Sequence, residues 1–303
     1  MEEIMNLDHT YMYEKMVQHE TMHPLISVID FSKVPPVPAS EPFEIKVRYG
    51  YYAVFLKEVN CGDLKYGKKT YDYQEGTLVF VAPGQIVGIS RDGKPKQLKG
   101  WALLFHPDLL HGTQLGRNMQ DYSFFSYETN EALHMSDQEQ QIIVDCFRKI
   151  QGELNHSIDK HSKTLIVSNI ELLLNYCVRF YDRQFITRSD SNKGVLTRFE
   201  GLLNTYFQSE KPQVVGLPSV KYCADQLNLS ANYFGDLIKK ETGQSAQDYI
   251  QQKLMDVAKE KIHDTQKTVS EIAYELGFKY PQHFTRLFKQ KTGYSPMDYR
   301  NLN

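Results

Sequence analysis

Side chains that can hydrogen-bond nucleic acid recur at matching places in two short segments near the C-terminus. Amide, imidazole and guanidinium groups near the start of a helix can reach base edges, whereas a lysine one turn farther on more often meets a phosphate. The alternative is a solvated helix face without a partner. The candidates for base edges are Asn232, Tyr233, Asp236, Gln282, His283 and Arg286, and the candidates for phosphates are Lys239 and Lys289.

Asp236 is the one acid among these candidates. Its carboxylate could accept a hydrogen bond from a cytosine amino group. It could equally cap a neighbouring group or repel the DNA backbone, and the sequence leaves these roles open.

The two segments are copies of one unit. Residues 233–250 (YFGDLIKKETGQSAQDYI) and 283–300 (HFTRLFKQKTGYSPMDYR) share eight of eighteen residues at a constant offset of about fifty, as the printed sequence shows. The identities are Phe234/Phe284, Leu237/Leu287, Lys239/Lys289, Thr242/Thr292, Gly243/Gly293, Ser245/Ser295, Asp248/Asp298 and Tyr249/Tyr299.

Each copy follows a shorter helix and a turn, so we predict helix–turn–helix units at about 219–241 and 268–291. Ser230 is a good N-cap for the helix that follows it. Thr268 and Glu271 fit a capping box, and Gly277 can adopt the left-handed backbone of a tight turn. The apolar residues Phe234, Leu237, Ile238, Phe284, Leu287 and Phe288 are expected in the core.

One helix, from about Ser245 to Ile262, is predicted between the units. At ~1.5 Å per residue it spans roughly 27 Å, close to the ~34 Å of one turn of B-DNA. Such a connector could hold two recognition helices in successive major grooves on one face of the duplex.

The region from about residue 195 resembles the AraC/XylS family of bacterial transcription regulators. The second copy contains the family's strongest signature: GF in the turn, FTRLFK in the helix and TGYSPMDYR after it. Two positions depart from the family pattern, Lys253 in place of the usual arginine and Asp236 on the first recognition helix. The resemblance implies double-stranded DNA as the partner, and RNA polymerase as well if the protein is an activator.

Length and composition limit the number of domains and the kind of DNA binding to expect. The 303 residues suffice for two domains, and the net charge of −2 argues against indiscriminate binding of polyanions. We predict a domain at 1–183, a polar linker at 184–194 and the DNA-binding domain at 195–303. Within it, Thr197 and Glu200 are expected to cap the first helix.

The cysteines and the hydrophobic segments point to a cytoplasmic bacterial protein. Cys61, Cys146, Cys177 and Cys223 are scattered and form no CxxC motif, which is typical of reduced structural thiols. The acidic N-terminus does not fit a signal peptide, and no stretch reaches the ~20 apolar residues of a membrane span.

The N-terminal region reads as strands at 23–31, 42–59, 76–83 and 100–106, which favours a β-barrel or jelly roll. In residues 43–48 apolar and charged side chains alternate, as in a strand with one buried face. The pattern is similar to the cupin-like sensory domain of many AraC-family regulators. Tyrosines at 49–52, 71 and 73 could line a ligand pocket or simply pack in the barrel, so no ligand residue is assigned.

Two apolar-faced helices are predicted after the strands, one capped by Ser136 and Glu139 and one at roughly 159–182. The family resemblance implies a homodimer contact through such a helix, and the alternative is that both only pack on the barrel. The predicted fold class is therefore α+β: a cupin-like barrel with dimerisation helices, followed by an all-α double helix–turn–helix domain.

Cupin barrels also hold metal-dependent enzymes, which bind their metal through His-x-His and a glutamate on one strand and a later histidine. None of the ten histidines forms His-x-His, none lies at i, i+4 on a predicted helix, and no nucleophile–base motif or phosphate loop is present. We therefore predict no catalytic residues, no metal and no cofactor. The expected function is a sequence-specific transcription regulator whose barrel senses a small molecule or serves in dimerisation; the alternatives are a cupin-like binding protein or enzyme with a vestigial DNA module, or a regulator without an effector.

Overall fold

The computed structural model describes residues 4–57, 64–66, 69–70, 76–91, 93–127, 131–157, 159–187 and 189–301. The chain divides into two compact units, Met1–Thr187 and Arg188–Asn303, which we call unit 1 and unit 2. Tyr71, Tyr73 and Cys61 lie outside the described residues. Within them, no helix combines the length and apolar character that crossing a bilayer requires.

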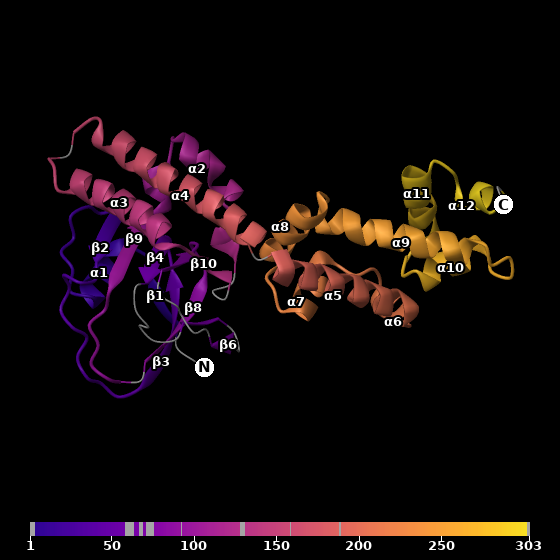
Figure 1. The fold of residues 1–303 in the computed structure, drawn as a ribbon, viewed down its shortest axis with the longest axis horizontal. Coiled ribbons are helices and arrows are strands. Elements are labelled where there is room, and N and C mark those ends of the chain that lie inside the picture. Colours follow the sequence, from indigo (N-terminus) through magenta and orange to yellow (C-terminus); the bar gives the residue numbers. More distant parts are fainter. Residues whose placement is uncertain are drawn as a thin grey trace. The chain divides into compact units, whose positions relative to one another are not determined.

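Unit 1 contains two five-stranded sheets (Figure 1). The first has the order β1-β3-β8-β5-β6 and the second β10-β7-β4-β9-β2. The strands of the first sheet are β1 (Ile4–Leu7), β3 (Phe43–Tyr49), β8 (Ile86–Arg91), β5 (Leu64–Tyr66) and β6 (Lys69–Thr70). Those of the second are β10 (Leu133–His134), β7 (Thr77–Val81), β4 (Tyr52–Lys57), β9 (Gly100–Phe105) and β2 (Ile26–Asp30).

Alternation along the strands builds a core between the two sheets. In the second sheet Ile29 pairs with Ala102, which pairs in turn with Phe55, so their side chains share one face. All three belong to a buried cluster that also includes Val47 and Val87 of the first sheet. The short helix α1 (Thr10–Met16) contributes Met12 and Tyr13 to the edge of this cluster.

The N-terminal region is sheet-rich, as predicted, but a closed barrel is not what the described strands form. No ladder joins the two sheets among these strands. β1 and β8 were not predicted from the sequence: β1 is a four-residue edge strand, and β8 contains Gly88, which weakens the strand pattern.

Helices cover the outer face of the second sheet. α3 (Asp137–Leu154) begins with the predicted capping box of Ser136 and Glu139, and its Phe147 ring stacks on Trp101 of β9 at 6.0 Å. α4 (Ser162–Thr187) is fastened by Arg183, which donates to the Glu139 carboxylate at 2.6 Å and to the His134 carbonyl at 2.7 Å. Between β9 and β10 lie α2 (Gln114–Asn118) and the 3-10 helices Pro107–Leu110, Met119–Asp121 and Ser123–Ser126.

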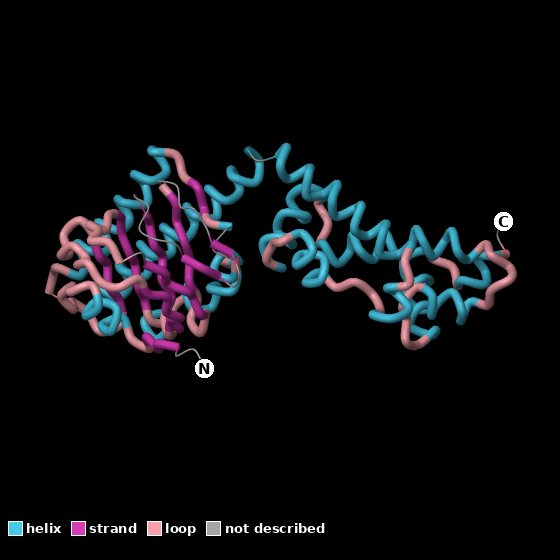
Figure 2. The backbone as a smooth tube through the Cα atoms, turned by 90° about the horizontal axis from the view of Figure 1, so that it is seen from below, coloured by secondary structure: helices cyan, strands magenta, loops and turns pink. Residues whose placement is uncertain are grey.

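Unit 2 consists of helices and loops in its described residues (Figure 2). α9 (Ala246–Ile262) is the predicted connector; α7 and α8 adjoin its N-terminal half, and α10 to α12 adjoin its other end (Figure 1). The remaining helices are α5 (Ser189–Gln208), α6 (Lys211–Val215), α7 (Val220–Leu227), α8 (Ala231–Thr242), α10 (Val269–Glu275), α11 (Pro281–Thr292) and α12 (Pro296–Arg300).

The segment predicted as a linker is largely helical. Residues 184–187 end α4 and residues 189–194 belong to α5, because polar residues without proline can continue a helix. The prediction that Thr197 caps a helix is therefore wrong, since Thr197 lies inside α5. Glu200 instead accepts a hydrogen bond from the Tyr249 hydroxyl, which ties α5 to α9.

Candidate nucleic-acid interface

The first helix–turn–helix unit is formed by α7 and α8. The Ser219 hydroxyl caps α7, and Asn228 ends it with a left-handed backbone at φ 60°. The Ser230 hydroxyl then accepts from the backbone N–H of Tyr233 and caps α8, as predicted. Because the caps fix both helix ends, the angle between α7 and α8 is set locally.

The second unit, α10 and α11, makes the same turn differently. The Thr268–Glu271 capping box starts α10, and Gly277 adopts φ 92° in the turn, both as predicted. A Cβ on Gly277 would lie 2.7 Å from the Pro212 carbonyl oxygen and 2.9 Å from the Gly216 carbonyl carbon. Glycine is thus required twice here, by the backbone angle and by the close approach of α6.

The two units end alike. The Thr242 hydroxyl donates to the Ile238 carbonyl and the Thr292 hydroxyl to the Phe288 carbonyl, both at 2.7 Å. The following glycines at 243 and 293 have φ 72° and 83°, as expected for C′ caps. In both units this shared ending directs the backbone from the recognition helix into the next helix.

Most of the predicted contact residues lie on the surface of the recognition helices. On α11, Gln282, His283, Arg286 and Lys289 are exposed. On α8, Asn232 and Lys239 are exposed and Asp236 is half-buried. Spacings of three and four residues place each set on one side of its helix.

Tyr233 does not lie where the sequence analysis placed it. Its side chain belongs to the core of unit 2, with only 7% of the residue exposed. The repeat led to this wrong prediction, because Tyr233 was expected to be exposed like His283, the residue at the matching position of the second copy. The expected core residues Phe234, Leu237, Ile238, Phe284 and Phe288 are buried, whereas Leu287 is only half-buried.

Tyr280 is a surface residue that the sequence analysis missed. It precedes α11 with an extended backbone, gives no side-chain cap, and is 56% exposed. Its ring packs edge-on against the His283 ring, with centroids 5.5 Å apart. A tyrosine at an N-cap position, where serine is the better residue, was the signal that could have indicated it.

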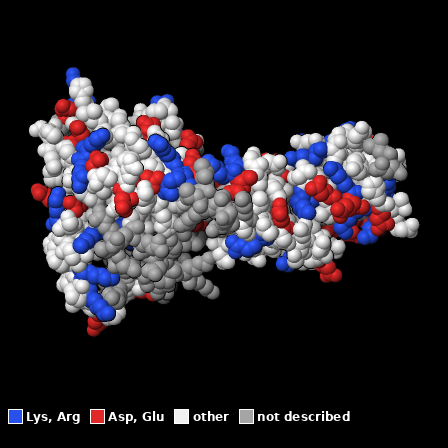
Figure 3. Space-filling view, in the orientation of Figure 1, with Lys and Arg blue, Asp and Glu red and all other residues white. Residues whose placement is uncertain are grey.

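Charges of both signs alternate on the face of unit 2 that Figure 3 shows. Lys261 and Lys267 both pair with the Glu275 carboxylate, at 3.0 and 2.6 Å. The hydrogen bond from Lys267, followed by that from Lys261, lowers the pKa of Glu275 against the opposing effect of its desolvation. Glu275 neutralises only one of these two lysines, but the whole chain has a net charge of −2, so placed contacts rather than a broad basic field must provide any affinity for DNA.

A family model described as a helix-turn-helix domain matches residues 223–302. The HTH-type transcriptional activator RhaS of Salmonella paratyphi A is 24% identical over 160 residues, which cover 53% of this chain and 55% of RhaS. Residues 223–302 form an AraC-type helix-turn-helix domain. The chain thus spans about half the length of this curated relative.

Other similarities to the AraC-type domain are shorter or more distant. An uncharacterized HTH-type regulator of Bacillus subtilis, YobQ, is 32% identical over 27% of this chain and 34% of its own length. The C-terminal domain of AraT, a response regulator from Geobacillus stearothermophilus, is 26% identical over 36% of this chain and 85% of that one, with a TM-score of 0.32. The match to ToxT of Vibrio cholerae covers 91% of this chain and 98% of ToxT, with 10% sequence identity and a TM-score of 0.29.

The described residues contain no group of three or more histidine, cysteine, aspartate or glutamate side chains placed to hold a metal ion. The His106 and His111 rings both approach the Asp108 carboxylate, at 3.4 and 3.7 Å, at the end of β9. Cys146, Cys177 and Cys223 are buried free thiols, and burial raises the pKa of each.

Proposed function

We propose that this protein is a sequence-specific DNA-binding transcription regulator that reads two adjacent major-groove segments per chain. The observation that carries the proposal is the pair of similar helix–turn–helix units joined by α9, each presenting a polar helix face. The 17 residues of α9 span about 26 Å, a length that suits successive major grooves.

We assign base contacts to the first two turns of the recognition helices and phosphate contacts to the lysines that follow. Arg286 is the strongest candidate, because a guanidinium can bind guanine with two hydrogen bonds. Tyr233 is excluded from the contact set by its burial. The base-contact set is Asn232, Asp236, Gln282, His283 and Arg286, and the phosphate-contact set is Lys239 and Lys289.

Genome-wide footprinting with the purified full-length protein tests this function. We expect protection of a few sites that share two half-motifs about one helical turn apart. Protection that spreads evenly over the genome would contradict sequence-specific binding. A double variant, Gln282→Ala with Arg286→Ala, serves as the control and should lose the specific footprints.

We further propose that the protein acts as a homodimer that uses α4. This helix buries Ile170, Leu173 and Cys177 against the rest of unit 1. Its residues Leu165 and Leu172 are 46% and 39% exposed. The two exposed leucines are seven residues apart, a spacing typical of helices that pair with a second copy of themselves. Analytical ultracentrifugation of a Leu165→Glu, Leu172→Glu variant should show monomers, whereas Lys163→Glu on the same helix should remain dimeric.

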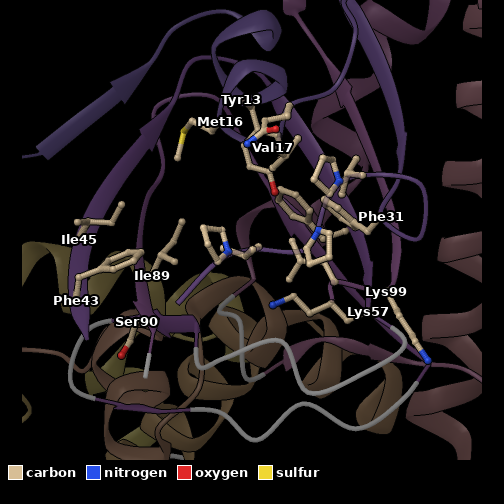
Figure 4. Close-up of a pocket in the computed structure, with 18 of the residues that line it drawn as sticks. Tyr13, Met16, Val17, Phe31, Phe43, Ile45, Lys57, Ile89, Ser90 and Lys99 are labelled. Carbon is tan, nitrogen blue, oxygen red and sulfur yellow. The ribbon is translucent and has the colours of Figure 1, made fainter. Parts of the chain in front are cut away.

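Unit 1 is proposed to be a cupin-like sensory domain that binds a small-molecule effector in the cytoplasm. Its support is the pair of facing sheets with a cavity of about 250 Å³ between them (Figure 4). If the regulator is an activator, RNA polymerase is an additional partner. DNA affinity that changes when an effector binds would separate this proposal from a regulator controlled by abundance alone.

A further inference from the structure

The two recognition helices begin differently, although the repeat makes them copies of one unit. Five helices of unit 2 begin with a hydroxyl side chain that accepts a hydrogen bond from the first turn, which stabilises the helix. These capping residues are Ser219, Ser230, Ser245, Thr268 and Ser295, on α7, α8, α9, α10 and α12. α11 departs from this pattern, because its N-cap Tyr280 makes no side-chain hydrogen bond to the first turn.

The backbone starts α11 without help from the Tyr280 side chain. A residue before proline is pushed out of the helical region into an extended conformation, and Tyr280 has φ −132° and ψ 117°. Pro281 is the first residue of α11 and has no N–H to be capped. The His283 N–H donates to the Tyr280 carbonyl at 3.0 Å. The position therefore suits serine as well as tyrosine, and the tyrosine ring needs another explanation.

The Tyr280 ring lies beside the His283 ring on the surface of the recognition helix. The two ring centroids are 5.5 Å apart and the ring planes meet at 64°, an edge-on arrangement that aromatic rings favour. His283 is exposed, and an exposed side chain loses rotamer freedom when it binds a partner. A ring already held by Tyr280 loses less of this freedom, so the contact favours binding through His283.

Much of the Tyr280 ring also remains open to solvent, since the residue is 56% exposed. Large exposed aromatic side chains are typical of binding surfaces, because the ring provides apolar contact area with few rotatable bonds. Gln282 and His283, which follow in the first turn of α11, belong to the base-contact set proposed above. In the major groove, thymine presents an apolar C5-methyl group beside the polar base edges. An apolar ring next to polar contact residues matches that surface.

We propose that Tyr280 determines part of the specificity of the second unit: it positions the His283 ring for a base edge, and its own exposed face contacts the methyl group of a neighbouring thymine. The inference rests on the proposed DNA-binding function and adds a residue to it. Tyr280 stands where Ser230 stands in the first unit, fifty residues earlier, and it lacks the cap that Ser230 provides. Local sequence rules are broken most often where function requires another residue.

Tyr280→Ser in the full-length protein should change stability and binding in opposite directions. Serine restores a cap, so we expect a higher urea midpoint of unfolding. The operator, taken as the DNA fragment with the strongest specific footprint, should bind about fivefold more weakly, while scrambled DNA binds as before. Tyr280→Phe keeps the ring and should bind the operator like the unaltered protein. The matched control is Tyr11→Ser in unit 1, where a 50% exposed tyrosine stacks on the His9 ring at 5.6 Å; DNA binding should not change.

Operators in which single thymines are replaced by deoxyuridine locate the methyl contact, because deoxyuridine lacks only the C5-methyl group. At one position in the half-site of the second unit, the replacement should weaken binding of the unaltered protein about fourfold, the value of burying one methyl group. The same replacement should have no effect on Tyr280→Ser. A double-mutant cycle tests the positioning of His283: the combined loss of Tyr280→Ser and His283→Ala should be smaller than the sum of the single losses.

The outcomes separate this inference from the proposed function. If the unaltered protein gives no specific footprints, both fail. Specific footprints together with equal operator affinity of the unaltered protein and Tyr280→Ser would contradict the role of Tyr280 and leave the function standing. Equal losses for Tyr280→Phe and Tyr280→Ser would assign the contact to the hydroxyl group and a phosphate, and would overturn the proposal. A deoxyuridine series that affects the unaltered protein and Tyr280→Ser equally at every position would overturn it as well.

Discussion

The two helix–turn–helix units share their endings but differ in their turns and in their recognition faces. Both recognition helices end with a threonine that bonds a carbonyl one turn earlier, then a left-handed glycine and a serine cap. The turn before each helix uses Asn228 in one unit and Gly277 in the other. On the faces, Tyr233 is buried and Asp236 half-buried, while their counterparts His283 and Arg286 are exposed.

The difference indicates a division of labour between the units. The shared endings position the helices, so they tolerate little change in either copy. The recognition faces can differ because most of their side chains lie on the surface and not in the core of unit 2. We infer that the second unit contributes more direct contacts to bases, since the first two turns of α11 expose three groups that can hydrogen-bond them, Gln282, His283 and Arg286.

The largest expected effect concerns the turns. Gly277→Ala should lower the free energy of unfolding by about 2–4 kcal/mol, because its Cβ meets backbone and its φ is positive. Asn228→Ala should cost about 1 kcal/mol, since Cβ is already present and only the backbone preference is lost. Urea denaturation of the full chain, monitored by a signal from the helices, measures the unfolding free energy of both variants. Equal losses would show that the close approach of α6 is unimportant.

The next effect concerns DNA recognition. Arg286→Ala should lower the affinity for specific DNA by about 1–3 kcal/mol, the value of a bidentate contact to guanine. Asp236→Ala in the first unit should cost less, about 0.5–1 kcal/mol, because its carboxylate would accept a single hydrogen bond from a cytosine amino group. Titrations on operator and scrambled DNA give the two values. A larger loss for Asp236→Ala than for Arg286→Ala would show that the first unit contributes more to base reading than the second.

The lysines should behave alike in the two units. Lys239→Ala and Lys289→Ala should each weaken binding to specific and scrambled DNA similarly, and reduce the salt dependence by about one phosphate contact. Titrations across a range of salt concentrations measure the slope. A loss confined to operator DNA would identify the lysine concerned as a base contact.

A smaller effect is expected at the helix starts. Ser230→Ala should destabilise the protein by about 1 kcal/mol, because the side-chain cap on the Tyr233 N–H is lost. Tyr280→Ala removes no cap and should change the stability by less than about 0.5 kcal/mol. It should, however, weaken binding of operator DNA if Tyr280 positions the His283 ring. Denaturation and titration of the same two variants separate the roles.

The smallest effect is a difference in sensitivity to acid. The hydrogen bonds from Thr268 lower the pKa of Glu271, first from its backbone N–H and then from its hydroxyl. A lowered pKa stabilises the fold above the unfolded value of about 4.3, and this stabilisation is lost as the pH falls through the folded value. α7 has no such box, so α10 should lose amide protection first on acidification. Glu271→Gln should abolish the difference; if it persists, the capping box is not its cause.

The sequence indicated the local features of unit 2 because they depend on neighbours in the chain. The caps at Ser230 and Thr268, the turn at Gly277 and the connector α9 follow from short-range patterns. The boundary of α5 did not, since the cap-forming residues 189–192 and Gly194 favour a break in the helix, yet α5 begins at Ser189 and continues through Gly194. The prediction that Tyr233 is an exposed contact residue was also wrong, because the repeat predicts its position on a helix but not which neighbouring helices cover it.

In unit 1 the sequence determined which segments are extended and apolar, and only the tertiary structure decided how they meet. Alternation in β3 fixed one apolar face, but the separation of β3 from β4 left part of that face to line a cavity. Long-range pairing and packing are not encoded in any local pattern, whereas the helix caps and turns of the AraC-type domain are.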